Sequence, residues 1–217
     1  MPLELFDMEG CPHCRPVREA LTELDLDVLV YPCPKRGERH RPRARALAQK
    51  ERFPTLHDPE SDLTLVGKRA ILRHVFERFA HTAPPFRYRI GMASSGIATG
   101  SRRLRGLFAT PARPAEKLLE LWSFESSPYS RIVRERLCEL ELAYVLHNLG
   151  KEQTSDIGAP GLRLSFGPYA PVPGGKRAAL LARGGRVQVP YLEDPNTQTK
   201  LYESRAIVDY LERTYAL

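Results

Sequence analysis

Two cysteines near the start of the chain are the residues whose types and spacing most clearly suggest chemistry. Cys11 and Cys14 form the sequence Cys-Pro-His-Cys directly after the short apolar run 3–6. This context predicts that the pair begins a helix, where unpaired backbone N–H groups and the helix dipole stabilise an anion. The pKa of the Cys11 thiol should therefore be low. Its thiolate would attack a disulfide, and Cys14 would resolve the mixed disulfide.

The surrounding residues favour this redox interpretation over a metal site. His13, Arg15 and Arg18 add positive charge that stabilises the thiolate. A Cys-x-x-Cys pair also binds zinc, but zinc needs two further ligands. No second Cys-x-x-Cys and no pair of histidines occurs at metal-binding spacing, so we expect no metal.

The other two cysteines, Cys33 and Cys138, are expected to be less important for function. Cys33 should follow the second strand and emerge at the same sheet edge as Cys11, either as a third thiol within reach or, as we favour, as a bystander. Cys138 lies in a helical pattern and should be a small buried residue. Four cysteines are too few for a secreted disulfide scaffold, so the sequence predicts a reducing, cytoplasmic environment.

An internal repeat organises the chain. Residues 3–15 match residues 119–131 at an offset of 116 (119 − 3), with Cys-Pro-His-Cys aligned to Ser-Pro-Tyr-Ser. Later, residues 53–59 match residues 189–195 at an offset of 136 (189 − 53). Two separated blocks in the same order indicate a duplication, and the change in offset indicates a twenty-residue insertion in the second copy.

Each copy alternates apolar runs with helical patterns. In the first copy Val17, Ala20, Leu21 and Leu24 form one helix face, and the whole copy follows the order β-α-β-α-β-β-α. A helix is expected over residues 39–50 and broken at Pro42, and Ala70, Ile71, His74 and Val75 form the apolar face of the last helix. This order is that of the thioredoxin fold, with its first two strands parallel.

The predicted fold class is therefore α/β, with two tandem thioredoxin-fold modules, each a four-stranded mixed sheet flanked by helices. The boundaries are 1–80 for the module with Cys-Pro-His-Cys, 81–115 for a basic linker, and 116–217 for the module with Ser-Pro-Tyr-Ser and the insertion.

The net charge of +7 is concentrated in two segments without acids, residues 81–115 with six arginines and residues 157–192 with five basic residues. We interpret both as solvated loops, and no specific nucleic acid partner is predicted. Within the linker, Ile97, Leu104, Leu107 and Phe108 are spaced for a short amphipathic helix. Packing of this helix against a module is favoured over contact with a membrane surface.

A proline occupies the same place in both copies, in Phe53-Pro54 and Val189-Pro190. Its recurrence before a short strand suggests a cis peptide bond with one shared role. The residue before each proline would offer its backbone N–H and C=O to an extended, peptide-like ligand beside the cysteine position.

These motifs resemble those of a known family. Cys11-Pro12-His13-Cys14-Arg15, Phe53-Pro54 and residues 69–71 are similar to glutaredoxins and to the N-terminal domains of glutathione transferases, and residues 202–207 look still more like the transferase type. The chain also resembles proteins with two such domains in tandem. The resemblance implies glutaredoxin-like modules that bind glutathione through residues matching the family pattern: Arg15, Phe53, Pro54, Ser127, Val189, Pro190, Glu203 and Ser204.

In this resemblance the Val189 backbone pairs with the cysteinyl part of glutathione, and Glu203-Ser204 holds the γ-glutamyl end. The first copy departs from the pattern, because Gly67-Lys68 stands in place of Glu-Ser. This departure puts its glutathione affinity in question but not its dithiol chemistry.

The expected function is a glutathione-linked thiol–disulfide oxidoreductase acting on a disulfide-containing substrate through Cys11 and Cys14. One alternative is a non-catalytic module that binds glutathione or protein, and a weaker one is a serine-type glutathione transferase using Ser127. Ser127 and Ser130 replace both thiols of the second copy, so that copy cannot exchange thiols. It is either a docking module or a structural partner.

Overall fold

The computed structural model of the chain describes residues 2–90, 105–156 and 169–217. Residues 2–90, the first half, contain β1 (Leu3–Asp7), α1 (Arg15–Glu23), β2 (Val28–Pro32), α2 (Arg41–Ala48), β3 (Thr55–Asp58), β4 (Leu63–Val66), α3 (Lys68–Val75), the π-helical turn η1 (Phe76–Ala80) and α4 (Arg87–Ile90). The second half, from residue 119, contains β5 (Leu119–Ser123), α6 (Pro128–Glu139), β6 (Tyr144–Asn148), the 3₁₀ turn η2 (Thr154–Asp156), α7 (Lys176–Gly184), β7 (Tyr191–Asp194), β8 (Thr199–Tyr202) and α8 (Ser204–Tyr215).

Both halves of the chain arrange their strands in the same way. In the first half β1 pairs parallel with β2 and antiparallel with β3, which pairs antiparallel with β4. In the second half β5 pairs parallel with β6 and antiparallel with β7, which pairs antiparallel with β8. The α/β class and the thioredoxin-like strand arrangement expected from the sequence are thereby confirmed.

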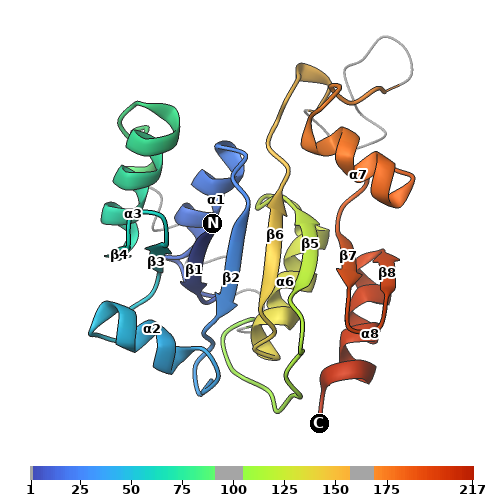
Figure 1. The fold of residues 1–217 in the computed structure, drawn as a ribbon, viewed down its shortest axis with the longest axis horizontal. Helices are drawn as coiled ribbons and strands as arrows, with labels where there is room; N and C mark the ends of the chain where they lie inside the picture. The colour runs from blue at the N-terminus through green and yellow to red at the C-terminus, as the bar shows by residue number, and fades with distance from the viewer. Residues whose placement is uncertain (1, 91–104, 157–168) are drawn as a thin grey trace.

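The strands of the two halves form one mixed sheet of eight strands in the order β4-β3-β1-β2-β6-β5-β7-β8 (Figure 1). A four-stranded sheet was expected in each module, and the joining of the two was not foreseen: β2 and β6 pair antiparallel along their outer edges. Leu29 lies opposite Val145 at the centre of this pairing. Pairing satisfies the backbone groups that two apolar edge strands would otherwise expose.

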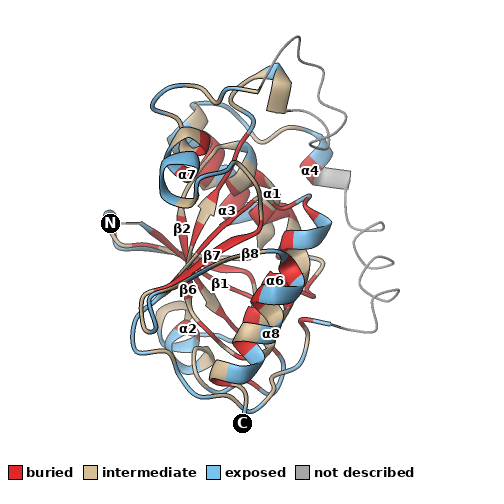
Figure 2. Ribbon diagram, turned by 90° about the vertical axis from the view of Figure 1, so that its right-hand side faces the viewer, coloured by how far each residue is buried: buried red, intermediate tan, exposed pale blue. Residues whose placement is uncertain are grey.

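Helices cover the sheet and enclose its main hydrophobic cluster. Helix α1 packs beside α3, and α6 packs beside α8 on the flank where Figure 2 draws both helices along the sheet. The predicted apolar face of α1 is fully buried at Val17, Ala20 and Leu21. One hydrophobic cluster contains these residues together with Leu121 and Leu146 of the second half, so the core continues across the β2–β6 junction.

Some details differ from the sequence expectations. Helix α2 begins at Arg41, so Pro42 lies in its first turn, where a proline is tolerated, and does not break it. Ala70, expected on the apolar face of α3, is exposed, because the buried face of this short helix is formed by Ile71, Leu72 and Val75.

The linker helix falls partly beyond the structure, because Ile97 and Leu104 lie outside the described residues. Among the residues that are described, no helix has the length and apolar character required to cross a membrane.

Candidate functional site

The Cys-x-x-Cys pair lies at the junction of β1 and α1. The backbone N–H of Cys11 donates to the Met8 carbonyl at 2.9 Å, and the N–H groups of Cys14 and Arg15 both donate to the Cys11 carbonyl. Cys14 is the N-cap of α1, and Pro16 lies in the first turn. Both thiols are free. Cys11 is 8% exposed and Cys14 is 0% exposed, so only the first thiol is open to a reaction partner.

The two thiols differ strongly in acidity. A hydrogen bond from the Cys14 thiol, aided by the backbone N–H groups of His13 and Cys14, lowers the pKa of Cys11 to about 6 against the effect of burial. Burial raises the pKa of Cys14 well above its usual value, and its hydrogen bond to Cys11 and the charge of Asp7 raise it further. The pair therefore holds one thiolate, on Cys11, and one protonated thiol, on Cys14, at neutral pH.

The two prolines that match each other in the repeat both follow cis peptide bonds, Phe53–Pro54 and Val189–Pro190. Phe53 packs against the cluster that contains Cys11 and Cys14, so the first cis bond lies beside the reactive pair. The Pro54 carbonyl accepts a hydrogen bond of 2.8 Å from the Gly67 N–H, which ties the turn before β3 to the start of α3.

A cleft of about 560 Å³ opens in the first half beside these residues. His13 lines the cleft next to the cysteines, and Phe53 lines it at the cis peptide bond. The other lining residues belong to the loop before β3, the end of β4 and the start of α3. Its lining residues are His13, Arg52, Phe53, Val66, Gly67, Lys68, Arg69 and Ala70. Four of these eight residues are basic and none carries a carboxylate.

Arg15, expected to bind the ligand, lies elsewhere. Its Nε is 2.9 Å from Oε1 of Glu19, one turn further along α1, and it is absent from the lining of the cleft. Arg18, expected to add charge near the thiols, is 2% exposed and is held by buried carboxylates.

The second half uses its matching residues for local structure. Ser127 Oγ accepts a hydrogen bond from the Ser130 N–H at 3.2 Å and caps α6. Ser127 is 3% exposed, so its hydroxyl is largely shielded from a ligand. Oγ of Ser130 is buried without a hydrogen-bond partner among the described residues.

The remaining residues expected to bind glutathione lie at one end of the β7–β8 pair. Val189 and Pro190 precede β7, and Glu203 and Ser204 follow β8, whose Tyr202 lies opposite Tyr191. Ser204 is 8% exposed. The Glu203 carboxylate accepts a hydrogen bond of 2.6 Å from Gln188, a residue of the segment after α7.

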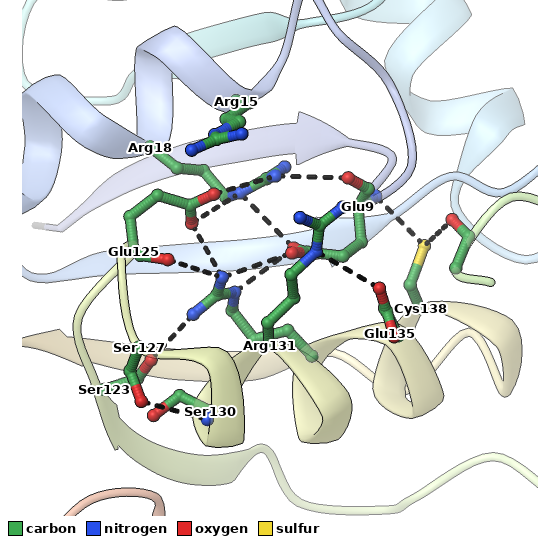
Figure 3. Close-up of polar contacts among 12 residues, drawn as sticks. Glu9, Arg15, Arg18, Ser123, Glu125, Ser127, Ser130, Arg131, Glu135 and Cys138 are labelled. Atoms are coloured by element: carbon green, nitrogen blue, oxygen red, sulfur yellow. Dashed lines mark hydrogen bonds and ion pairs between the residues drawn. The ribbon is translucent and has the colours of Figure 1, made fainter. Parts of the chain in front are cut away.

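A buried ring of charges joins the two halves, and it was not expected from the sequence (Figure 3). Arg18 contacts Glu125 through Nε at 3.0 Å, and Arg134 contacts Glu9 through Nη2 at 3.2 Å. The ring is closed by ion pairs of Glu9 with Arg18 at 3.3 Å and of Glu125 with Arg134 at 2.9 Å, and Asp7 pairs with Arg18. A signal was present, because Glu9 and Glu125, like Arg18 and Arg134, are aligned in the repeat.

The chain segment that enters the second half covers the loop before Cys11. The Gly106 carbonyl accepts a hydrogen bond of 3.1 Å from the Gly10 N–H and one of 3.4 Å from the Cys138 thiol. Gly106 has φ of +69°, and a Cβ there would lie 3.1 Å from side-chain atoms of Glu9 and Glu135. A residue without a side chain is therefore needed at this crossing.

The other two cysteines are buried. Cys33 packs with Phe6 and Ala44, in a different cluster from Cys11, and burial raises the pKa of its thiol. It is therefore a bystander in this structure. Cys138 is 3% exposed, as predicted, and shares the apolar cluster of Cys11 and Cys14. In the part of the chain that the structure describes, no three His, Cys, Asp or Glu side chains group as metal ligands.

The strand arrangement, the cis-proline turn and the helix-capping cysteine define a thioredoxin-like protein. A model of the glutathione S-transferase N-terminal domain matches residues 5–84 and 121–217, which together make up most of the sequence. The chain belongs to this family.

Two solved structures are similar to part of this chain. A delta-class glutathione transferase from Nilaparvata lugens is 22% identical, over 48% of this chain and 46% of that one, with a TM-score of 0.32. A glutathione S-transferase from Ceriporiopsis subvermispora, determined in complex with glutathione, is 12% identical over 48% of this chain and 45% of that one, also with a TM-score of 0.32. The chain thus spans less than half the length of either transferase. No curated protein matches it.

Proposed function

We propose that the chain is a glutathione-linked thiol–disulfide oxidoreductase that works through Cys11 and Cys14. The observation that carries the proposal is the division of acidity between the two thiols. Cys11 has a pKa of about 6 and is slightly exposed, whereas Cys14 is buried and protonated behind it. A nucleophilic thiolate with a protonated resolving thiol one helical turn away is the arrangement that dithiol exchange requires.

The reaction begins when the Cys11 thiolate attacks one sulfur of a substrate disulfide. A new S–S bond forms, the substrate disulfide breaks, and the released sulfur leaves as a thiolate that takes up a proton. Cys14 then loses its proton and attacks Cys11 Sγ, which expels the second substrate thiol. The substrate has gained two electrons, and the protein pair has become a disulfide. Two molecules of glutathione restore the dithiol and leave as glutathione disulfide.

Formation of the mixed disulfide itself activates the second step. Before the reaction, the hydrogen bond to Cys11 and the Cys11 charge both raise the pKa of Cys14. Both effects end when the Cys11 sulfur becomes part of a neutral disulfide. The Cys14 thiol is therefore more acidic in the intermediate than in the resting protein, and it is already one turn away from its target.

In this proposal the second half is a supporting partner. It has no thiol at Ser127 or Ser130, and Ser127 Oγ is engaged in capping α6. Its Glu125 and Arg134 complete the buried charge ring around Arg18, the residue that pairs with Asp7 at the end of β1. This contact positions the element that carries the Cys-x-x-Cys pair.

The test is glutathione-dependent reduction of hydroxyethyl disulfide, followed through glutathione reductase and NADPH. We expect activity in the native chain and its loss in Cys11→Ser. Cys33→Ala is the matched control, since it removes a buried thiol outside the reactive cluster and should retain activity. A native chain that is inactive, although its Cys11 is reduced and reacts with iodoacetamide, would contradict the proposal. A non-catalytic binding module would then be the better account.

A further inference from the structure

The cleft beside Cys11 has uncompensated positive charge. Arg52, Lys68 and Arg69 line it, and within the described residues none of the three forms an ion pair with a carboxylate. Nearby cations such as Arg41 and Arg78 are paired with Glu51 and Asp58. The three cations of the cleft are instead gathered on one lining without a carboxylate, and they are free to contact an incoming group.

Two of these cations occupy an unfavourable position. Lys68 and Arg69 are the first residues of α3, whose first turn contains no acid. The N-terminus of a helix carries partial positive charge, so acids are stabilising there and cations are not. An anion bound in the cleft would relieve the repulsion between these side chains and the helix end.

The second half has the opposite charge at the same place. Glu203 and Ser204 begin α8 where Gly67 and Lys68 begin α3. Packing does not explain the missing acid, because a Cβ at Gly67 would have no atom within 4 Å. The backbone of Gly67, with φ of +87° and ψ of 151°, favours glycine, although Glu203 adopts a positive φ of +68° at the matching position. The space for a carboxylate exists in the first half, but the residue that would bind an ammonium group is absent.

We propose that this cleft binds the negatively charged end of a small disulfide substrate that carries carboxylate or other acidic groups and no ammonium group. The inference rests on the proposed function and specifies its substrate class. The Cys11 thiolate repels an anion, and Lys68, Arg69 and Arg52 offset this repulsion so that an acidic disulfide can approach. Glutathione carries one ammonium group, so its disulfide fits the cleft less well than a disulfide with carboxylates alone.

The experiment measures single-turnover reduction by the pre-reduced native chain of three symmetric disulfides: dithiodipropionate with two carboxylates, neutral hydroxyethyl disulfide, and cystamine with two ammonium groups. Each rate constant is divided by the rate constant of the neutral thiol β-mercaptoethanol with the same disulfide, which removes intrinsic reactivity without adding a charge effect of the reference thiol. We expect the normalised rate for dithiodipropionate to exceed that for cystamine by at least about tenfold at low salt, and salt to reduce the difference.

The decisive variant is the double substitution Lys68→Gln with Arg69→Gln. It should remove most of the preference for dithiodipropionate and leave the rate with hydroxyethyl disulfide near that of the native chain. Arg73→Gln is the matched control, because Arg73 is exposed on the same helix but does not line the cleft. Its preference should equal that of the native chain.

Two results would overturn the inference: equal normalised rates for all three disulfides, or an unchanged preference in the double variant. If no disulfide reacts although Cys11 titrates as a free thiol, the proposed oxidoreductase function fails instead. Binding of dithiodipropionate to Cys11→Ser, measured by titration calorimetry, then decides the site separately. Binding that the Lys68→Gln, Arg69→Gln pair abolishes supports the acidic ligand, and absence of binding rejects it.

Discussion

At the scale of single residues, Cys11 and Cys14 have the same chemical group in two different environments. The helix end and the second thiol stabilise charge on Cys11, and complete burial opposes charge on Cys14. Because folding lowers the pKa of Cys11, its ionised form contributes stability above the pKa of the unfolded thiol. That contribution is lost as the pH falls through about 6.

The rate of Cys11 alkylation by iodoacetamide should follow this pKa, with a midpoint near pH 6. Cys14→Ala removes the hydrogen bond that contributes most to the shift, so the midpoint should move toward the value of a free thiol, ~8.5. Cys33→Ala should leave it unchanged. Peptide mass spectrometry assigns the alkylated cysteine. A midpoint in the native chain close to that of a free thiol would contradict the assignment of Cys11 as the thiolate.

At the scale of elements, local sequence patterns predict the turn that carries Cys11 and Cys14. They predict less well the strand pairing and the buried charges that hold this turn in place. The spacing of Val17, Ala20 and Leu21 is sufficient to predict α1, because the buried face of a helix is a property of that helix alone. The partner of β2 is not predictable in this way. An apolar strand has the same pattern whether its outer edge is free or paired with β6, so the pattern left the eight-stranded sheet unforeseen.

The buried charge ring was missed for a related reason. Arg18 and Arg134 each look like an ordinary cation on a helix, and only their shared place in the repeat distinguishes them. Burial of charge is stable when every group has a partner, and here the partners come from the opposite half of the chain. The sequence of one copy by itself does not contain that information.

Arg134→Met should therefore be strongly destabilising. It leaves Glu9 and Glu125 buried with Arg18 as their remaining cation in the ring, and loss of one member of a buried ion pair costs about 3–5 kcal/mol. The free energy of unfolding in urea measures the effect. Arg213→Gln, at an exposed position on α8, is the control and should change stability by less than about 0.5 kcal/mol. A similarly small change in Arg134→Met would mean that the ring does not hold the halves together.

At the scale of the whole molecule, the sheet and the core make the two halves one folding unit. β2 and β6 lie at the centre of the eight strands, and one hydrophobic cluster extends to both sides of them. Neither half can unfold without exposing an apolar strand edge and the buried charges of the other. Each half has the same thioredoxin-like arrangement of strands, but the stability of each half depends on its contacts with the other.

The two halves should therefore unfold in a single transition. Trp122, the only tryptophan, reports on the second half by fluorescence, and Cys14, which is fully buried, reports on the first half by pulsed alkylation. We expect the same urea midpoint for both. Alkylation of Cys33, which is buried among first-half residues in a cluster apart from Cys138, is the internal control and should follow Cys14. Reactivity of Cys14 at clearly lower urea would show that the first half opens independently.

The charge ring and the β2–β6 pairing are both symmetric with respect to the two halves of the chain. Arg18 reaches Glu125 as Arg134 reaches Glu9, and Leu29 faces Val145, its own counterpart in the repeat. The junction is thus self-complementary about a two-fold axis, in the manner of a symmetric homodimer. A chain with one such half already contains a complete interface for a second copy. Fusion makes the partner permanent, and it then allows one of the two to lose its thiols, because Ser127 and Ser130 lie outside the contacts that hold the pair together.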